Sequence, residues 1–179
     1  FVAKARGAAT NYRLGTDAQG DVVFTVGSAR LDAHPDARLT DVQWAHIAGA
    51  VFNGSLELTV TVEEVNGDWQ TYFTSMPWNG AVPSDDGAFT IGDGVFVGDI
   101  DEVRVWSSHR SQNDLATFRS QVLVGTEAGL VAYYPFDDGG STVEDFTARN
   151  DSDVAGVRGG GASIQPDTGA LTKSDTDTD

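Results

Sequence analysis

Hydrophobic and polar residues alternate in short runs through the first two thirds of the chain. Alternation with a period of two is typical of β-strands that bury one face. It predicts strands over residues 1–5, 11–14, 21–26, 43–52, 56–65 and 69–75. Asn-Gly pairs at 53–54 and 66–67 are hairpin signals between the later runs. The polar residues 30–40 are predicted to form a loop.

Residues 88–106 contain two further apolar runs, joined by a Gly-Asp-Gly turn. The second run alternates valines with charged residues, as a strand with one buried face does. In a regular strand Asp99 and Asp101 would lie on the same face as these valines, and two carboxylates conflict with burial of that face. A bulge or bend near Ile100 would resolve the conflict, and we expect one there.

A short helix is predicted over residues 111–122. Ser111 is a suitable N-cap residue. Leu115, Phe118 and Val122 follow at helical spacing and form one apolar stripe.

Two more strands are predicted after the helix, over residues 130–136 and 142–146. A run of three glycines then begins at 159, and the last residues are acidic and polar. This composition predicts one domain over residues 1–158, followed by a Gly-rich linker and an acidic tail over 159–179 that is mobile after about 165.

Several of these segments together resemble a known family. Residues 91–106 (IGDGVFVGDIDEVRVW), followed by 107–115 (SSHRSQNDL), resemble the end of a laminin-G-like, concanavalin A-like jelly-roll domain. Residues 44–48 (WAHIA) are similar to a second signature strand of that family, and 129–137 (GLVAYYPFD) to its opening strand. The resemblance covers residues 1–150. It implies an all-β, two-sheet antiparallel β-sandwich with one short helix.

The order of the segments differs from the family pattern, because the opening-type strand follows the closing-type strand. The chain begins as if in the middle of such a domain, which would leave apolar faces and strand edges to be covered. We expect residues 130–136 to pair with the 1–5 region or its neighbours, within one subunit or across two. The short connection before residue 130 favours pairing within the subunit.

Composition narrows the function classes. The net charge is −16, from 27 acidic and 11 basic residues, which argues against binding to nucleic acid or anionic membranes. No apolar run is long enough to span a membrane. The chain has no cysteine, so it has no disulfide framework. We expect an extracellular or cell-surface location, as the resemblance implies.

The resemblance also implies a structural calcium ion beside the closing strand. By position, Asp101 is the best ligand and Asp145 its partner, with Asp99 and Asn150 as further candidates. Carboxylate and amide oxygens are ligands that Ca²⁺ prefers. The alternative is that Asp101 caps a turn or pairs with a nearby arginine.

The cluster of Asp99, Asp101 and Glu102 also raises the question of glycoside hydrolysis, which uses paired carboxyl groups. Glucanases of this sandwich class carry a Glu-x-Asp-x-x-Glu strand. Arg104 stands where the last glutamate should be, so we predict that the chain is not an enzyme.

Aromatic residues gather around segment 66–80. Trp69, Tyr72 and Trp78 could contact a sugar or a peptide, or they could close one end of the sandwich. Trp44 is predicted to lie in the core, and His46 to be structural.

The leading functional prediction is a non-catalytic extracellular interaction module for adhesion or carbohydrate binding. Its partners would be a glycan, an extracellular protein or further copies of the chain through strand pairing. The alternative is a structural subunit of a fibre, sheath or surface layer, and a glucanase-type hydrolase is the least favoured.

Overall fold

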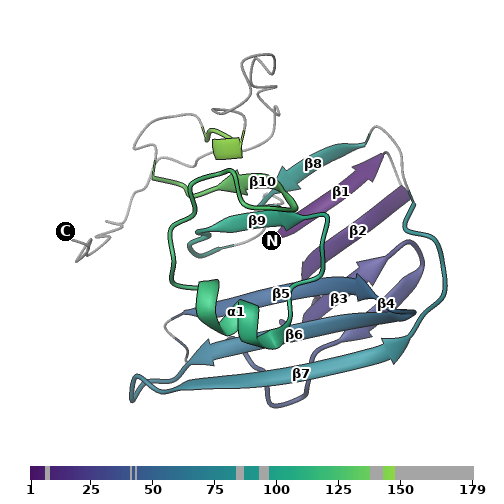
Figure 1. The fold of residues 1–179 in the computed structure, drawn as a ribbon. Helices are drawn as coiled ribbons and strands as arrows, with labels where there is room; N and C mark the ends of the chain where they lie inside the picture. The colour runs from purple at the N-terminus through teal and green to yellow at the C-terminus, as the bar shows by residue number, and fades with distance from the viewer. Residues whose placement is uncertain are drawn as a thin grey trace.

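A computed structural model describes residues 1–6, 9–40, 42, 44–83, 87–92, 97–137 and 143–147. The described residues form antiparallel β-sheets with a single short helix (Figure 1). The predicted all-β jelly-roll sandwich is therefore confirmed.

The first sheet has five antiparallel strands. In spatial order they are β4 (Ala29–Asp32), β3 (Val22–Val26), β2 (Ala9–Thr16), β1 (Val2–Arg6) and β8 (Ala88–Ile91). The register of β2 on β3 and of β3 on β4 is unbroken, whereas β1 has one irregularity against β2 after Lys4.

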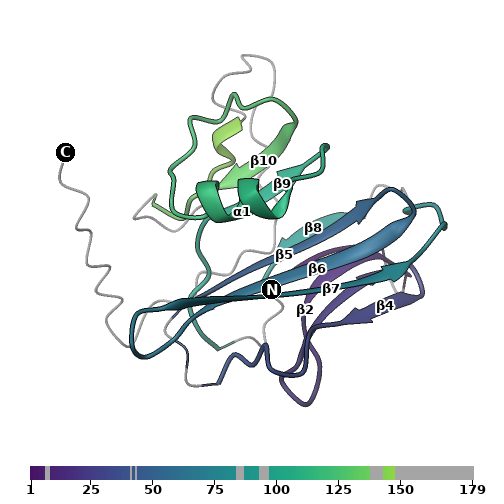
Figure 2. The ribbon, with the colours of Figure 1, turned by 60° about the horizontal axis from the view of Figure 1, so that its bottom comes forward.

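The second sheet consists of β5 (Ala45–Phe52), β6 (Ser55–Glu63) and β7 (Trp69–Pro77) in that order. Both turns have the predicted Asn-Gly sequence. Asn53 has a φ of 46° and Gly54 a φ of 74°, in the left-handed region that this turn requires. The sheet packs across the first one on the side of β3 and β4 (Figure 2).

A third, smaller unit stands beside the sandwich. It comprises the ribbon β9 (Val103–Trp106) with β10 (Leu130–Tyr134), and the helix α1 (Gln112–Phe118) between them in sequence. Ser111 caps α1 as predicted, and its side chain and that of Asp114 form a reciprocal capping box. In both views α1 lies over the face of the β5–β7 sheet that points away from the first sheet.

The sealed core lies where β3 and β4 meet β6. Alternate residues of β6 are almost fully buried, and these are Leu56, Leu58, Val60 and Val62. Opposite them lie Val22, Phe24 and Leu31. Gly49 of β5 lets the two sheets approach, because a Cβ at this position would stand 2.6 Å from the Phe24 ring.

The other half of the sandwich is less well covered. Every residue of β9 is half-buried, as are most residues of β1, β5 and β8. The first sheet has five strands and the second has three, so the second sheet does not extend over β1 and β8.

Four details differ from the sequence predictions. Residues 29–32 form β4, where a loop was expected, because Leu31 is buried against β3 and β6. Residues 143–147 contain no strand, and Asp145 instead closes a tight turn on Thr147. Helix α1 ends at Phe118, before Val122. Trp44 is 46% exposed and does not belong to the core.

The pairing of the opening-type strand also differs. Residues 130–134 pair within the chain, but with β9 and not with β1 or its neighbours. Contact with the first sheet is made through side chains, since the rings of Tyr134 and Phe89 stack with centroids 6.1 Å apart. The predicted irregularity before β9 is present as a bend at Gly98 and a left-handed φ of 55° at Glu102.

The predicted linker and tail, residues 159–179, lie outside the described residues. No helix in the described part of the chain has the length and apolar character needed to cross a membrane.

Candidate binding cleft

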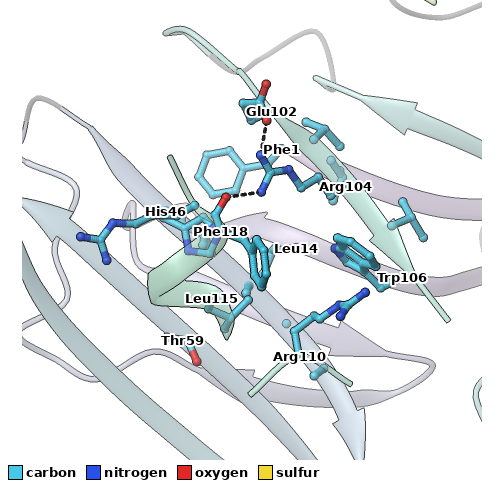
Figure 3. A pocket seen from close by; sticks show the side chains of 18 of the residues that line it. Phe1, Leu14, His46, Thr59, Glu102, Arg104, Trp106, Arg110, Leu115 and Phe118 are labelled. Atoms are coloured by element: carbon cyan, nitrogen blue, oxygen red, sulfur yellow. Dashed lines mark hydrogen bonds and ion pairs between the residues drawn. The ribbon is translucent and has the colours of Figure 1, made fainter. Parts of the chain in front are cut away.

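A large cleft lies between the β5–β7 sheet, α1 and β9 (Figure 3). Its volume is about 1420 Å³. Typical small-molecule sites enclose roughly 300–1,000 Å³, so this cleft has room for a chain-like ligand. It runs along the edge of β5 and reaches both faces of that strand. It therefore has an outer part under α1 and an inner part against the first sheet.

The floor of the outer part is formed by residues of β6 and β7 whose side chains lie on the sheet face opposite the core. Thr59 pairs with Phe73 across these strands, so both side chains are on the face opposite the core. Trp69, four residues before Phe73, is on the same face. Trp69 is 40% exposed and Phe73 is 42% exposed. Two large aromatic rings on this face are therefore open to a ligand.

An arginine from the end of α1 reaches this aromatic pair. The Arg119 guanidinium carbon lies 4.6 Å from the centre of the Trp69 ring. This is within the range of a cation–π contact. The contact places a positive charge beside the exposed indole.

A histidine–carboxylate pair lies at another point on the cleft wall. The Nε2 atom of His109 is 2.9 Å from a carboxylate oxygen of Glu57, and the imidazole ring stacks on Phe52 with centroids 3.8 Å apart. Neither His109 nor Glu57 was singled out from the sequence, because 52 residues separate them.

A second arginine fixes the loop before α1. Arg110 lies over the ring of Trp106, 3.6 Å from its centre, and donates to the backbone oxygen of Ala128 at 2.8 Å. Trp106 and Arg110 therefore form a rigid wall between β9 and the helix.

His46 points into the cleft from β5 and keeps a neutral ring. Burial lowers its pKa to about 4, and the positive charges of Arg104 and Arg119 contribute further. Near neutral pH the ring therefore offers one donor and one acceptor.

The wall on the side of β9 is held by a network around Arg104. One terminal nitrogen of Arg104 donates to Glu102 and, at 2.5 Å, to the backbone oxygen of Gln121. The other donates to the backbone oxygen of Phe118 at 2.6 Å (Figure 3). Arg104 thus ties β9 to the carbonyl groups that end α1.

Tyr133 extends this network into β10. Its hydroxyl donates to the second oxygen of Glu102 at 2.7 Å and accepts from the backbone N–H of Leu123 at 3.3 Å. The side chain is fully buried. Burial, together with the bond to Glu102, raises the pKa of Tyr133 to about 12, so its hydroxyl remains a donor.

The predicted calcium ligands are not gathered into one group by the described residues. Asp99 and Asp101 are exposed in the bend before β9. One oxygen of Asp145 accepts three hydrogen bonds, from the N–H of Tyr133 and from the N–H and hydroxyl of Thr147. Asn150 lies outside the described residues. No cluster of three acidic, histidine or cysteine side chains suited to a metal occurs in the described ranges. The calcium ion stays a prediction.

The three predicted ligand-binding aromatics have different surroundings. Trp69 lines the cleft. Tyr72 and Trp78 pack against the sandwich core, and Tyr72 also stacks on His34. Trp44, expected in the core, lines the cleft instead.

The carboxylates considered for hydrolysis have other partners. Glu102 is hydrogen-bonded to Arg104 and Tyr133. Glu57 lines the cleft from the outer face of β6 and is hydrogen-bonded to His109. Glycosidases need two carboxyl groups flanking the scissile bond.

The architecture defines a class, a jelly-roll sandwich with a ligand-sized cleft beside its smaller sheet. Residues 1–116 match a laminin G family model, described as the Concanavalin A-like lectin/glucanases superfamily. The chain therefore belongs to this superfamily as a laminin G-like domain, as the sequence resemblance indicated. No curated protein and no solved structure gives a significant match.

This family assignment limits the function in general terms. Laminin G-like domains serve as carbohydrate- or protein-binding modules and are typically non-catalytic, although the superfamily also includes glycosidases. They are commonly extracellular. The matched segment ends within α1, so β10 lies beyond it.

Proposed function

We propose that this domain is a non-catalytic carbohydrate-binding module of the cell surface or extracellular space, and that it binds a glycan in the outer part of the cleft. The observation that supports this most directly is the pair of exposed rings, Trp69 and Phe73, with Arg119 beside the first. The C–H face of a pyranose packs on such rings, while its hydroxyl groups need charged or polar partners.

The spacing of the rings favours an oligosaccharide. The two rings are four positions apart along β7, which is about 13 Å at 3.3 Å per residue. One sugar ring cannot contact both. On the same face lie the hydroxyl group of Thr71, which is also hydrogen-bonded to Thr61, and the neutral ring of His46, and both groups can exchange hydrogen bonds with sugar hydroxyls.

Replacing Trp69 with alanine should abolish or strongly weaken glycan binding. A ring that packs on a ligand in this way contributes about 1–3 kcal/mol, which corresponds to a roughly 5- to 150-fold loss of affinity. A glycan array would identify the ligand, and calorimetry with the best oligosaccharide would measure the change.

The matched control is Val65→Ala in the neighbouring hairpin, where the side chain is 76% exposed and does not line the cleft. It should bind as the wild type does. If no glycan binds the wild-type chain, or if Trp69→Ala binds with unchanged affinity, the proposed site is wrong.

We further propose that any bound metal is calcium, held by Asp101 with help from Asp145 or nearby carbonyl oxygens. A cation that binds only the native state raises the melting temperature. Chelation of a calcium-loaded sample should therefore lower it, and Asp101→Ala should remove the effect. Asp68→Ala, in the exposed β6–β7 turn, is the control, and its melting temperature should still fall on chelation. An identical melt with and without chelator would contradict the site.

A further inference from the structure

The cleft follows an edge of β5 rather than one of its faces. Every residue from Ala45 to Val51 lines it. Since successive strand residues point to opposite faces, a hollow that touches all of them must run along the edge. In the described part of the chain this edge has no partner strand, because β5 is the outer strand of its sheet and pairs with β6 alone.

The facing wall is a second strand edge. All four residues of β9, Val103 to Trp106, line the same cleft. One edge of β9 is paired with β10, and among the described residues no strand pairs with the other. In each strand, alternate residues direct their N–H and C=O groups away from the existing partner. Two rows of backbone donors and acceptors therefore border one hollow.

The side of the hollow toward the first sheet is apolar and is lined by Phe1, Leu14 and Phe24. The side toward the helix is mixed, because Leu115 and Phe118 (Figure 3) stand there together with His46 and Arg119. The space is thus bounded by two strand edges, an apolar floor and a roof with apolar and polar residues. We refer to it as the β5–β9 slot.

The edge of β5 lacks the sequence features that usually protect an edge strand from pairing. Proteins normally shield an open edge with a lysine, a proline, a bulge or a very short strand. Residues 45–52, AHIAGAVF, include no lysine or proline. The strand is eight residues long, and its register against β6 is unbroken.

We propose that the β5–β9 slot binds one β-strand of another polypeptide, which pairs with β5 on one side and β9 on the other. A polypeptide backbone supplies donors and acceptors on both sides at the strand repeat, which glycans and lipids do not. Because one strand edge borders the hollow on each side, the ligand is a single extended segment. Its inward residues are apolar, and its outward residues, toward His46 and Arg119, are polar or acidic.

The probe is a synthetic peptide with the sequence of β6, SLELTVTVE. This sequence already pairs antiparallel with β5 at its other edge, and it alternates apolar and polar residues as the slot requires. Hydrogen exchange of the full chain should show saturable slowing of amides in β5 and in β9 together. Two peptides N-methylated at alternate residues, one for each edge, should each bind roughly tenfold more weakly or worse, since each loses a row of hydrogen bonds.

Three results would overturn the proposal. The first is no slowing of β5 and β9 exchange by the peptide, and the second is equal binding of the N-methylated peptides. The third is full protection of both edges before peptide is added, which would mean that the chain's own residues fill the slot. Val65→Ala, outside the cleft, should leave peptide binding unchanged. The peptide assay contains no glycan, so its outcome is independent of the proposed glycan site.

Discussion

Replacing Arg104 with methionine should lower the free energy of unfolding by about 3 kcal/mol, the low end of the range for breaking a buried ion pair. The Arg104 side chain is 10% exposed and that of Glu102 is 24% exposed. Methionine keeps much of the volume but supplies no donors. Glu102 would then lose its arginine partner in a partly buried site and retain its hydrogen bond from Tyr133.

The loss of stability should come from more than the broken ion pair. Arg104 also satisfies the carbonyl groups of Phe118 and Gln121, and its guanidinium lies 5.6 Å from the centre of the Tyr133 ring. Once these bonds are gone, the end of α1 is no longer tied to β9. We therefore expect faster hydrogen exchange in α1 and β9, while β3 and β6 remain protected.

Urea unfolding at neutral pH would measure the change, with Arg30→Met as the matched control. Arg30 also forms two ion pairs, with Asp17 and Asp32, but its side chain is 48% exposed. Exposed pairs contribute at most about 1 kcal/mol. Equal losses in the two variants would show that the Arg104 network does not hold the smaller unit in place.

Local pattern was sufficient to predict most of the fold. In β6 each apolar residue of the alternating run is in the core, because one strand face meets the other sheet along its whole length. The pattern failed where few residues carry it. Strand β4 has one buried apolar residue, Leu31, and its pairing with β3 is a tertiary property.

The cleft could be predicted only in part. Trp69 was identified from its aromatic neighbourhood, but alternation along β7 places Tyr72 on the opposite face, against the core. The contact between Trp69 and Arg119 joins residues 50 positions apart in the sequence, and the Glu57–His109 pair joins residues 52 positions apart. Contacts of this kind depend on where α1 docks, and no local spacing encodes that position.

The stability of the fold should fall as the pH drops from about 6.5 to about 4 because of His46. The ordinary pKa of histidine is about 6.5, and burial lowers that of His46 to about 4. Between these values the unfolded chain takes up a proton that the folded chain does not. The unfolded state thus binds more protons, so stability decreases with decreasing pH in this window.

The size of the effect follows from the width of the window. A difference of about 2.5 pH units corresponds to at most about 3 kcal/mol, at 1.36 kcal/mol per unit. Below pH 4 the folded form is protonated as well, and the contribution stops growing. Protonation is resisted mainly because the imidazole is buried, and in addition because Arg104 and Arg119 lie near it.

Urea unfolding of wild type and His46→Gln at intervals between pH 4 and 7 would test this. Carboxylates titrate in both proteins, so the informative quantity is the difference between the two curves. The variant should lose less stability across the window, and the gap should approach 3 kcal/mol near pH 4. Val51→Thr, on the same strand and without a titratable group, should shift the curve equally at every pH. Parallel curves for wild type and His46→Gln would show that His46 is not held neutral by the cleft.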